Sequence, residues 1–351
     1  MVQAFGPLTL GLTAASLVAS SAGVWISIRL ARRAGVLDVP NERSSHSVPT
    51  PRMGGVPMVG AALFAFGCWA FLAAGEVFSL KGLSSTILFA IAMFVLGFWE
   101  DLSGLSPLTR FLFQFFAVMI FLWTWAGLFP NIPLGGMILP QFLWILTGAI
   151  WIVWMVNLYN FMDGIDGLAG GEAAVASLFF FLLFARYGES GWAVANLFVA
   201  AASMGFLVHN WPPARVFMGD AGSAFLGAFY GMQAVVAPLT TSVPLLVLVL
   251  PFSNFIMDTT MTLFRRIWQG EKWYMAHRSH FYQRMTNLGM SHQKVTILEL
   301  LTVAASCVAA TGYLGFDFPG RVIVVIAVLS GFIAGGIWVI HKERSLGHDS
   351  S

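Results

Sequence analysis

Charge is scarce in this sequence. Only 10% of its 351 residues are Asp, Glu, Lys or Arg, whereas 58% are hydrophobic. Soluble domains carry about 25% charged residues, so the composition excludes a soluble globular protein and indicates a polytopic membrane protein. The formal net charge of +2 is too small to indicate a nucleic-acid partner.

Cysteine is also scarce. Cys68 and Cys307 both fall within apolar runs, where cysteine usually packs as a small hydrophobic residue, so the pair predicts neither a disulfide nor a metal site. The sequence lacks an internal repeat, and no Lys or Arg precedes its first apolar run, so we expect no cleavable signal peptide. A single membrane domain over 1–351 is predicted.

Long apolar runs are abundant. A membrane-spanning helix needs about 20 mostly apolar residues, and the runs predict an all-α fold with about eleven transmembrane helices. We expect these helices near 6–29, 56–75, 84–99, 108–126, 138–156, 171–187, 191–209, 221–237, 243–264, 295–314 and 320–340.

The positions of Lys and Arg predict the orientation. With a periplasmic N-terminus, fifteen of these cations fall on the cytoplasmic side and three, Lys81, Arg186 and Arg321, on the other. The positive-inside rule favours that orientation, which gives a cytoplasmic C-terminus. The polar segments then lie on the cytoplasmic face, where we expect the active site, at 31–55, 100–107, 157–170, 210–220 and 265–294.

Five carboxylates in three of these segments are candidates for chemistry. Glu100 and Asp101 follow one apolar run, Asp163 and Asp166 lie between two runs, and Asp220 precedes another. Asp163 and Asp166 would share a face if their segment were helical. Mg²⁺ prefers oxygen ligands and often binds one or two carboxylates plus substrate phosphates, so the pattern predicts metal-assisted chemistry on a phosphorylated substrate. Structural alternatives are a polar turn at 157–170, dipole complementation by Glu100–Asp101, and an N-cap at Asp220.

Basic residues occupy the other two segments. In 31–55, Arg43 and Arg52 stand among serines and glycines, a mixture that suits phosphate oxygens, although positive-inside anchoring is an alternative. The segment 265–294 holds basic and aromatic residues that would bind a phosphate or sugar, or would lie on anionic lipid. Two of them, His277 and His280, lack a third ligand at a zinc spacing.

One acid falls clearly inside a predicted span. Asp258 lies in the run 243–264, and charge within a membrane is costly enough to need a partner. We expect Asp258 to pair with Arg265 or Arg266.

Five motifs together resemble a known family. They are P-R-M-G-G at Pro51, E-D at Glu100, N-F-M-D-G-I-D-G-L-A at Asn160, F-M-G-D-A-G-S at Phe217 and H-R-S-H-F-Y-Q-R at His277. In this order, and over nearly the whole chain, they resemble the polyprenyl-phosphate N-acetylhexosamine-1-phosphate transferases. That family includes the phospho-MurNAc-pentapeptide translocase and the bacterial enzymes that start O-antigen or teichoic acid synthesis. The histidine motif is closer to the O-antigen-initiating branch.

The resemblance implies a reaction. A UDP-N-acetylhexosamine would give its sugar-1-phosphate to undecaprenyl phosphate in the bilayer, yielding undecaprenyl-diphospho-sugar and UMP, at the cytoplasmic face of a bacterial inner membrane. Mg²⁺ would be required, with Mn²⁺ as an alternative, and a homodimer is compatible with the resemblance. The donor stays open among the N-acetylated derivatives of glucosamine, galactosamine, fucosamine and quinovosamine.

The resemblance also implies roles for particular residues. The implied catalytic residues are Glu100, Asp101, Asp163, Asp166, His277 and His280. The implied metal ligands are Asp220, Asp101 and Asp163. The expected substrate-binding residues are Asn160, Asn210, Phe217, Arg43, Arg52, Arg278 and Arg284. Family members usually have Asp-Asp where this chain has Glu100-Asp101, so we assign the metal role to Asp101 rather than to Glu100.

Two other classes fit less well. CDP-alcohol phosphotransferases need D-G-x-x-A-R, but Asp166-Gly167 is followed by Leu168-Ala169-Gly170 without the arginine. A lipid-linked sugar transporter or flippase would place charges near the membrane midplane, often on broken helices within inverted repeats. This sequence shows no repeat, and Asp258 is the acid expected within a span.

Overall fold

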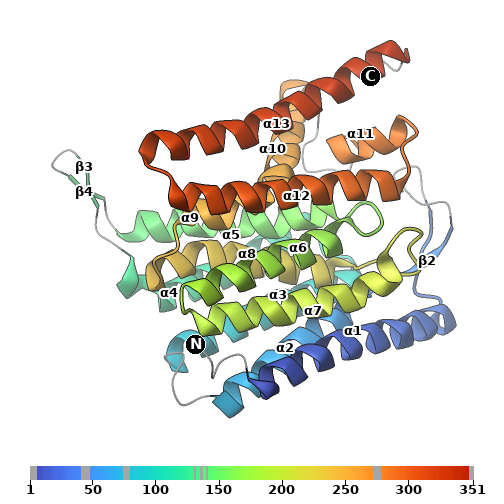
Figure 1. Ribbon diagram of the computed structural model, residues 1–351. Coiled ribbons are helices and arrows are strands. Elements are labelled where there is room, and N and C mark those ends of the chain that lie inside the picture. Colours follow the sequence, from blue (N-terminus) through green and yellow to red (C-terminus); the bar gives the residue numbers. More distant parts are fainter. Residues whose placement is uncertain are drawn as a thin grey trace.

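The computed structural model describes residues 6–40, 48–73, 80–129, 132–134, 137–139, 141–271 and 278–347. Among these residues, eleven helices are long and apolar enough to cross a membrane, which confirms the predicted all-α polytopic fold (Figure 1). Cys68 is half-buried and Cys307 is buried, and both are free thiols.

The elements follow one another along the chain. The helices of the first half are α1 (Pro7–Ala34), α2 (Gly55–Ala73), α3 (Leu80–Ser103), α4 (Pro107–Thr124), η2 (Ala126–Leu128), α5 (Gln141–Met162) and α6 (Leu168–Arg186). Those of the second half are α7 (Ser190–Asn210), α8 (Asp220–Thr240), α9 (Leu245–Val249), η3 (Leu250–Phe252), α10 (Ser253–Trp268), α11 (Phe281–Asn287), α12 (His292–Gly315) and α13 (Phe318–Ser345). Two antiparallel strand pairs join β1 (Leu37–Asp38) to β2 (Thr50–Pro51) and β3 (Ile132–Leu134) to β4 (Met137–Leu139).

The ninth predicted span is broken. The run 243–264 forms α9, the short 3₁₀ helix η3 and then α10. Pro251 lies in η3 and has no backbone N–H for an α-helical hydrogen bond, which accounts for the change in helix type. The predicted loop 265–294 is also partly helical, because it contains α11.

Helix α8 is the centre of the fold. Nearly all of its side chains are buried, and it packs against α2, α3 and α5. Small residues permit this close packing: a Cβ added to Gly97 of α3 would overlap the Asp220 carbonyl, and one added to Gly227 of α8 would overlap the α5 backbone at Met155. The start of α8 is therefore held against the end of α3.

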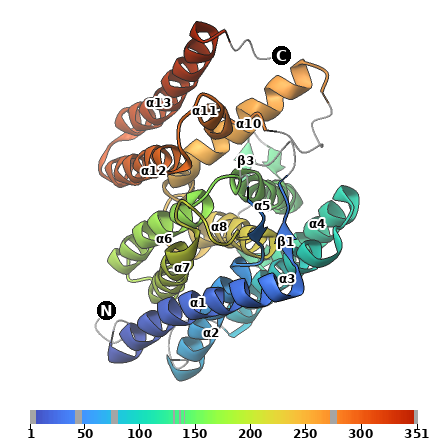
Figure 2. The same cartoon turned by 90° about the vertical axis from the view of Figure 1, so that its right-hand side faces the viewer.

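Helices α10 to α13 lie on one side of the central group formed by α5, α6 and α8, α1 to α3 lie on the other, and α4 lies at the edge of this group (Figure 2). Helix α12 packs on α6, whereas α13 leaves most of its side chains exposed. An apolar helix with so little protein cover is suited to contact with lipid.

Two predicted loops meet at one end of the helices, on the right in Figure 1. Phe217 donates its backbone N–H to the Pro51 carbonyl, and Gly54 and Gly55 donate theirs to the carbonyls of Phe217 and Met218. The P-R-M-G-G and F-M-G-D motifs, far apart in sequence, are therefore joined by backbone hydrogen bonds.

Asp258 was expected to be the acid within a span, but the structure places two further acids within predicted spans. Glu172 on α6 is fully buried, and the Asn254 side chain on α10 donates to it over 3.4 Å and to Glu299 on α12 over 3.0 Å. These acids lie in predicted spans as well, so the sequence interpretation missed them.

Candidate active site

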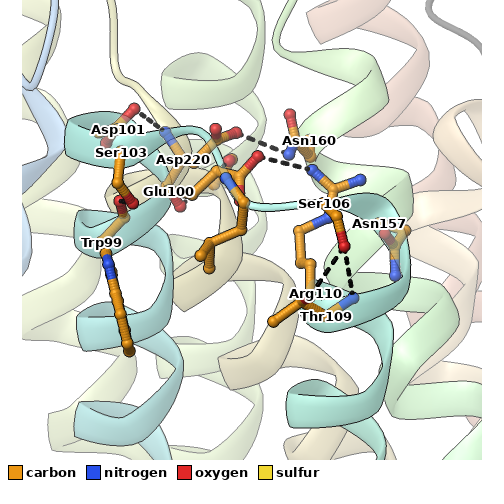
Figure 3. A network of polar contacts seen from close by, with 12 residues as sticks. Trp99, Glu100, Asp101, Ser103, Ser106, Thr109, Arg110, Asn157, Asn160 and Asp220 are labelled. Carbon is orange, nitrogen blue, oxygen red and sulfur yellow. Dashed lines mark hydrogen bonds and ion pairs between the residues drawn. The ribbon is translucent and has the colours of Figure 1, made fainter.

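Asp101, at the end of α3, binds the start of α8. Its Oδ1 accepts the Asp220 backbone N–H over 2.9 Å, and its Oδ2 accepts that of Ala221 over 3.0 Å (Figure 3). The first amides of a helix have no intrahelical acceptor, so the Asp101 carboxylate caps α8 from another helix. Gly219 precedes them at φ 77°, and a Cβ there would crowd the same carboxylate.

Asp220 is not the N-cap that was considered as an alternative. Gly219 holds that position and Asp220 is the first residue of α8. The Asn160 side chain, near the end of α5, donates to Asp220 Oδ1 over 2.7 Å (Figure 3). Asn160 was expected to bind substrate, and in the structure it fixes the orientation of this carboxylate.

Glu100 has different partners from its neighbour Asp101. Its Oε2 accepts the Leu105 backbone N–H over 3.1 Å, and its Oε1 lies 3.7 Å from the Arg110 guanidinium on α4. The E-D pair is therefore divided between α8 and the α3–α4 connection. Sequence reasoning counted Arg110 only as a cytoplasmic cation. The overlooked signal was the position of Arg110, which lies one turn after Pro107 and close in sequence to the predicted acid pair.

Asp163 lies in a non-helical turn between α5 and α6. Burial raises the pKa of its carboxyl well above the usual range, the negative charges of Asp220 and Asp101 raise that pKa further, and Arg52 opposes them. Three carboxylates from α3, α8 and this turn therefore lie close enough to repel one another. They form the acid cluster of Asp101, Asp163 and Asp220.

Asp166 faces a different set of partners. Its Oδ2 accepts the Ala214 backbone N–H over 3.0 Å, and its Oδ1 lies 3.3 Å from Nδ1 of His292, the first residue of α12. The helical face that Asp163 and Asp166 would have shared does not form, because their segment is a turn between α5 and α6. His292 was not predicted, since nothing in its local sequence marks it.

A cavity of about 440 Å³ opens beside Asp166. Asp166, Phe217 and His292 line it together with the loop around Pro212. Phe217 thus presents an aromatic ring, and Asp166 a carboxylate, to the same space. Asp166 was expected to be catalytic and Phe217 to bind substrate, each from a separate motif, and the structure brings them together at one cavity.

Asn210, at the end of α7, is buried behind this cavity. Its Oδ1 accepts the Gly167 backbone N–H over 2.9 Å, and its Nδ2 donates to the Val216 carbonyl over 2.8 Å. Gly167 has φ 77°, a conformation that favours glycine. The Asn210 amide therefore joins the two loops that carry Asp166 and Phe217, and its expected role in substrate binding stays a prediction.

The basic residues predicted to bind substrate are dispersed. Arg52 forms an ion pair with Asp38 over 3.1 Å. Arg278 donates to Asn287 Oδ1 over 3.2 Å. Arg284 is buried and donates through both Nε and Nη2 to Glu343 on α13. Arg43 and His277 lie outside the described residues.

His280 is buried and bound to Asp258, with Nδ1 and Oδ1 3.0 Å apart. The expected pairing of Asp258 with Arg265 or Arg266 is wrong, because Arg265 donates to the Ser279 carbonyl and Arg266 pairs with Glu271. A histidine 22 residues away in sequence, brought in by α11, satisfies the intramembrane acid instead.

The acid cluster fits a divalent cation shared with a substrate. Among the described residues, no group of three or more His, Cys, Asp or Glu is arranged to hold a metal ion. Mg²⁺ commonly uses only one or two carboxylates and takes its other ligands from phosphates and water. Asp163 and Asp220 offer that donor set, and a cation would relieve the repulsion that raises the Asp163 pKa. Asp101, also expected as a metal ligand, uses both oxygens on α8 amides, and its metal role stays a prediction.

Comparison with known proteins agrees with this geometry. The family model described as glycosyl transferase family 4 matches residues 83–238, which include the acid cluster. The chain is 31% identical to decaprenyl-phosphate N-acetylglucosaminephosphotransferase of Mycolicibacterium smegmatis, over 91% of this chain and 84% of that protein. It is 30% identical to a probable undecaprenyl-phosphate N-acetylglucosaminyl 1-phosphate transferase of Bacillus subtilis, over 76% and 74% of the two chains. The Escherichia coli undecaprenyl-phosphate alpha-N-acetylglucosaminyl 1-phosphate transferase is 25% identical over 88% and 84%.

Proposed function

This chain belongs to glycosyl transferase family 4, among enzymes that transfer a sugar phosphate to a polyprenyl phosphate, and we propose that it uses a UDP-N-acetylhexosamine as donor and undecaprenyl phosphate as acceptor. An acceptor phosphate oxygen attacks the sugar-linked phosphorus, the bond from that phosphorus to the bridging oxygen breaks, and UMP leaves. The observation that carries the proposal is the acid cluster beside a cavity lined by Asp166 and Phe217.

One group of residues would act on the diphosphate of the donor, and another would bind its nucleotide. Mg²⁺, with Mn²⁺ as an alternative, would be held by Asp163 and Asp220 and would neutralise charge on the diphosphate. Asn160 keeps Asp220 oriented, and Asp101 fixes the start of α8 on which Asp220 stands.

The cavity beside Asp166 would take the uridine. Its volume of about 440 Å³ falls within the range of about 300–1,000 Å³ that is common for small-molecule sites. The Phe217 ring offers a stacking surface for a planar base, and the Asp166 carboxylate accepts hydrogen bonds from base or ribose donors. Asn210 holds the two loops that carry these side chains.

The acceptor lipid would reach the acid cluster from the bilayer beside α3 and α4. Trp99, Leu102 and Leu108, next to Glu100 and Arg110, are apolar and exposed. A prenyl chain would lie on this surface and place its phosphate near the Arg110 guanidinium, which favours anionic oxygens. The alternative of a lipid-linked sugar flippase finds no support among the relatives, which are named as transferases.

Purified protein with undecaprenyl phosphate and a panel of UDP-N-acetylhexosamines tests the proposal, with UMP release as readout. The relatives named above transfer N-acetylglucosamine phosphate, so UDP-N-acetylglucosamine is the first donor to assay. We expect release with Mg²⁺, none with EDTA, and a loss of at least about a hundredfold for Asp220→Ala, since even residues that orient metal ligands contribute about 10- to 100-fold.

The matched control is Asp317→Asn. Asp317 caps α13 by accepting the Gly320 N–H, away from the acid cluster, and its variant should release UMP as the wild type does. UMP release that persists in EDTA, or in Asp220→Ala, contradicts the metal assignment. No release with any donor, together with no binding of UDP-sugars, rejects the transferase.

We propose further that the cluster faces the cytoplasm of a bacterial inner membrane and that the product starts O-antigen or another envelope polysaccharide. The excess of Lys and Arg at that end of the spans supports the orientation.

A further inference from the structure

Asp258 lies on α10 with 2% of its surface exposed and gathers four donors. Its Oδ1 accepts from His280 Nδ1 over 3.0 Å, from the Phe281 backbone N–H over 3.0 Å and from the Thr262 hydroxyl over 3.1 Å. Its Oδ2 accepts the Tyr282 backbone N–H over 3.1 Å. Three of these donors belong to 280–282, so one buried carboxylate fixes that segment to α10.

Tyr282 carries the connection on to the acid cluster. Its hydroxyl donates to the Phe161 carbonyl over 2.9 Å, two residues before Asp163. A Cβ added to Gly164 would overlap this hydroxyl, so the turn after Asp163 rests directly on the tyrosine. Burial, followed by the charge of Asp258, raises the pKa of Tyr282 well above its usual range, which keeps the hydroxyl protonated as a donor.

We propose that Asp258 is a positioning residue for sugar-phosphate transfer: it holds 280–282 in place, and Tyr282 in turn sets the position of the turn that carries Asp163. This inference rests on the proposed function. We call the contacts from Asp258 through 280–282 to the turn of Asp163 the clamp. His280, buried and bound to Asp258, is part of it. Displacement of a reacting group by about 1 Å can cost about a hundredfold in rate, so the clamp has a direct bearing on turnover.

The asparagine variant of Asp258 tests the clamp because it keeps the side-chain size. An amide has one acceptor oxygen, whereas the carboxylate uses both of its oxygens. If the amide oxygen faces His280 and Phe281, the NH₂ group faces the Tyr282 N–H; if it faces Tyr282, the NH₂ group meets the other three donors. Either orientation leaves a buried donor without its acceptor, which is costly.

The kinetic experiment compares Asp258→Asn, Asp258→Glu, Tyr282→Phe and the double variant Asp258→Asn/Tyr282→Phe with wild type. We expect kcat to fall about tenfold or more in Asp258→Asn while KM for the UDP-sugar changes less than about twofold, with partial recovery in Asp258→Glu. Tyr282→Phe should lose several-fold in kcat, and the double variant should be no slower than Asp258→Asn, because both changes interrupt one path.

Amide hydrogen exchange over 161–170 provides a readout that does not depend on activity. Exchange there should rise in Asp258→Asn and in Tyr282→Phe and stay unchanged in Asp317→Asn, the same substitution at a distant helix cap. Wild-type kcat in Asp258→Asn, or unchanged exchange over 161–170 in both clamp variants, overturns the inference. An inactive wild type rejects the proposed function instead, and the exchange data still decide the clamp. If Asp258→Asn fails to fold, kcat and the exchange over 161–170 are measured on Tyr282→Phe, which loses only a hydroxyl. Wild-type values of both in that variant then overturn the inference.

Discussion

Asp163 shows how a single residue can favour function over stability. Its raised pKa means that the folded protein binds this proton more tightly than the unfolded chain does. Above the unfolded pKa of about 3.9, ionisation of Asp163 therefore costs stability, and the free energy of unfolding falls as pH rises through the folded pKa. Residues held at such a cost are typical of active sites.

Replacement of Asp163 by Asn should separate these two effects. In EDTA we expect the Tm of Asp163→Asn to exceed that of wild type by more at pH 8 than at pH 5, because the raised pKa makes ionisation of the wild-type carboxyl cost stability as the pH rises. UMP release should fall by at least about tenfold, as for loss of a group that acts directly on the reaction. Thermal unfolding at both pH values measures the first effect. A lower Tm for the variant at pH 8 would show that Asp163 is stabilised by its surroundings.

At the scale of elements, the position of Asp101 depends on how closely α3 approaches α8. Gly97 lies one turn before Asp101 and faces the Asp220 backbone. In Gly97→Ala the added methyl group has to separate the two helices, and overpacking of this kind costs about 1–3 kcal/mol. We expect a lower Tm and a loss of UMP release that exceeds the loss of folded protein, because Asp101 would no longer reach the α8 amides.

The matched control for this variant is Gly60→Ala on α2. A Cβ at Gly60 meets no atom within 4 Å, and alanine favours helix by about 1 kcal/mol over glycine. Its Tm and activity should match or exceed those of wild type. Equal behaviour of the two variants would mean that the α3–α8 contact tolerates a methyl group and does not position Asp101.

The elements themselves could be predicted from sequence to different extents. The eleven spans were predictable because an apolar run of membrane length is a local property. Helix α11 was not, because its start is fixed by hydrogen bonds to Asp258 on α10. The division of α9 from α10 at Pro251 was signalled by the proline, but a window of 20 residues averages over such a break.

The site was predictable as a set of residues and not as a set of contacts. The acids near the ends of α3, α5 and α8 were expected on one face from the order of the spans. Their partners were not, because the bond from the Asp220 amide to Asp101 joins positions 119 apart and Asp166–His292 joins a turn to another helix. Such contacts depend on packing, which no local pattern encodes.

For the molecule as a whole, the proposed substrate bridges separate parts of the chain. The acid cluster draws on α3, α8 and the turn after α5, while the cavity draws on the loop after α7 and on the start of α12. A UDP-sugar with Mg²⁺ would contact all of these at once. Binding to the folded state alone stabilises it, by about 2.7 kcal/mol when the ligand is at a hundredfold excess over Kd.

We therefore expect UDP-sugar and Mg²⁺ together to raise the Tm of the whole protein more than the sum of their separate effects, because the diphosphate completes the metal site. In Asp220→Ala the contribution of Mg²⁺ should disappear while UDP-sugar alone still gives the wild-type increase, since the cavity around Phe217 and Asp166 is untouched. Differential scanning fluorimetry in detergent, with and without EDTA, measures each contribution. Additive shifts in the wild type would show that nucleotide and metal bind independently, and the cluster and the cavity would then not serve one substrate.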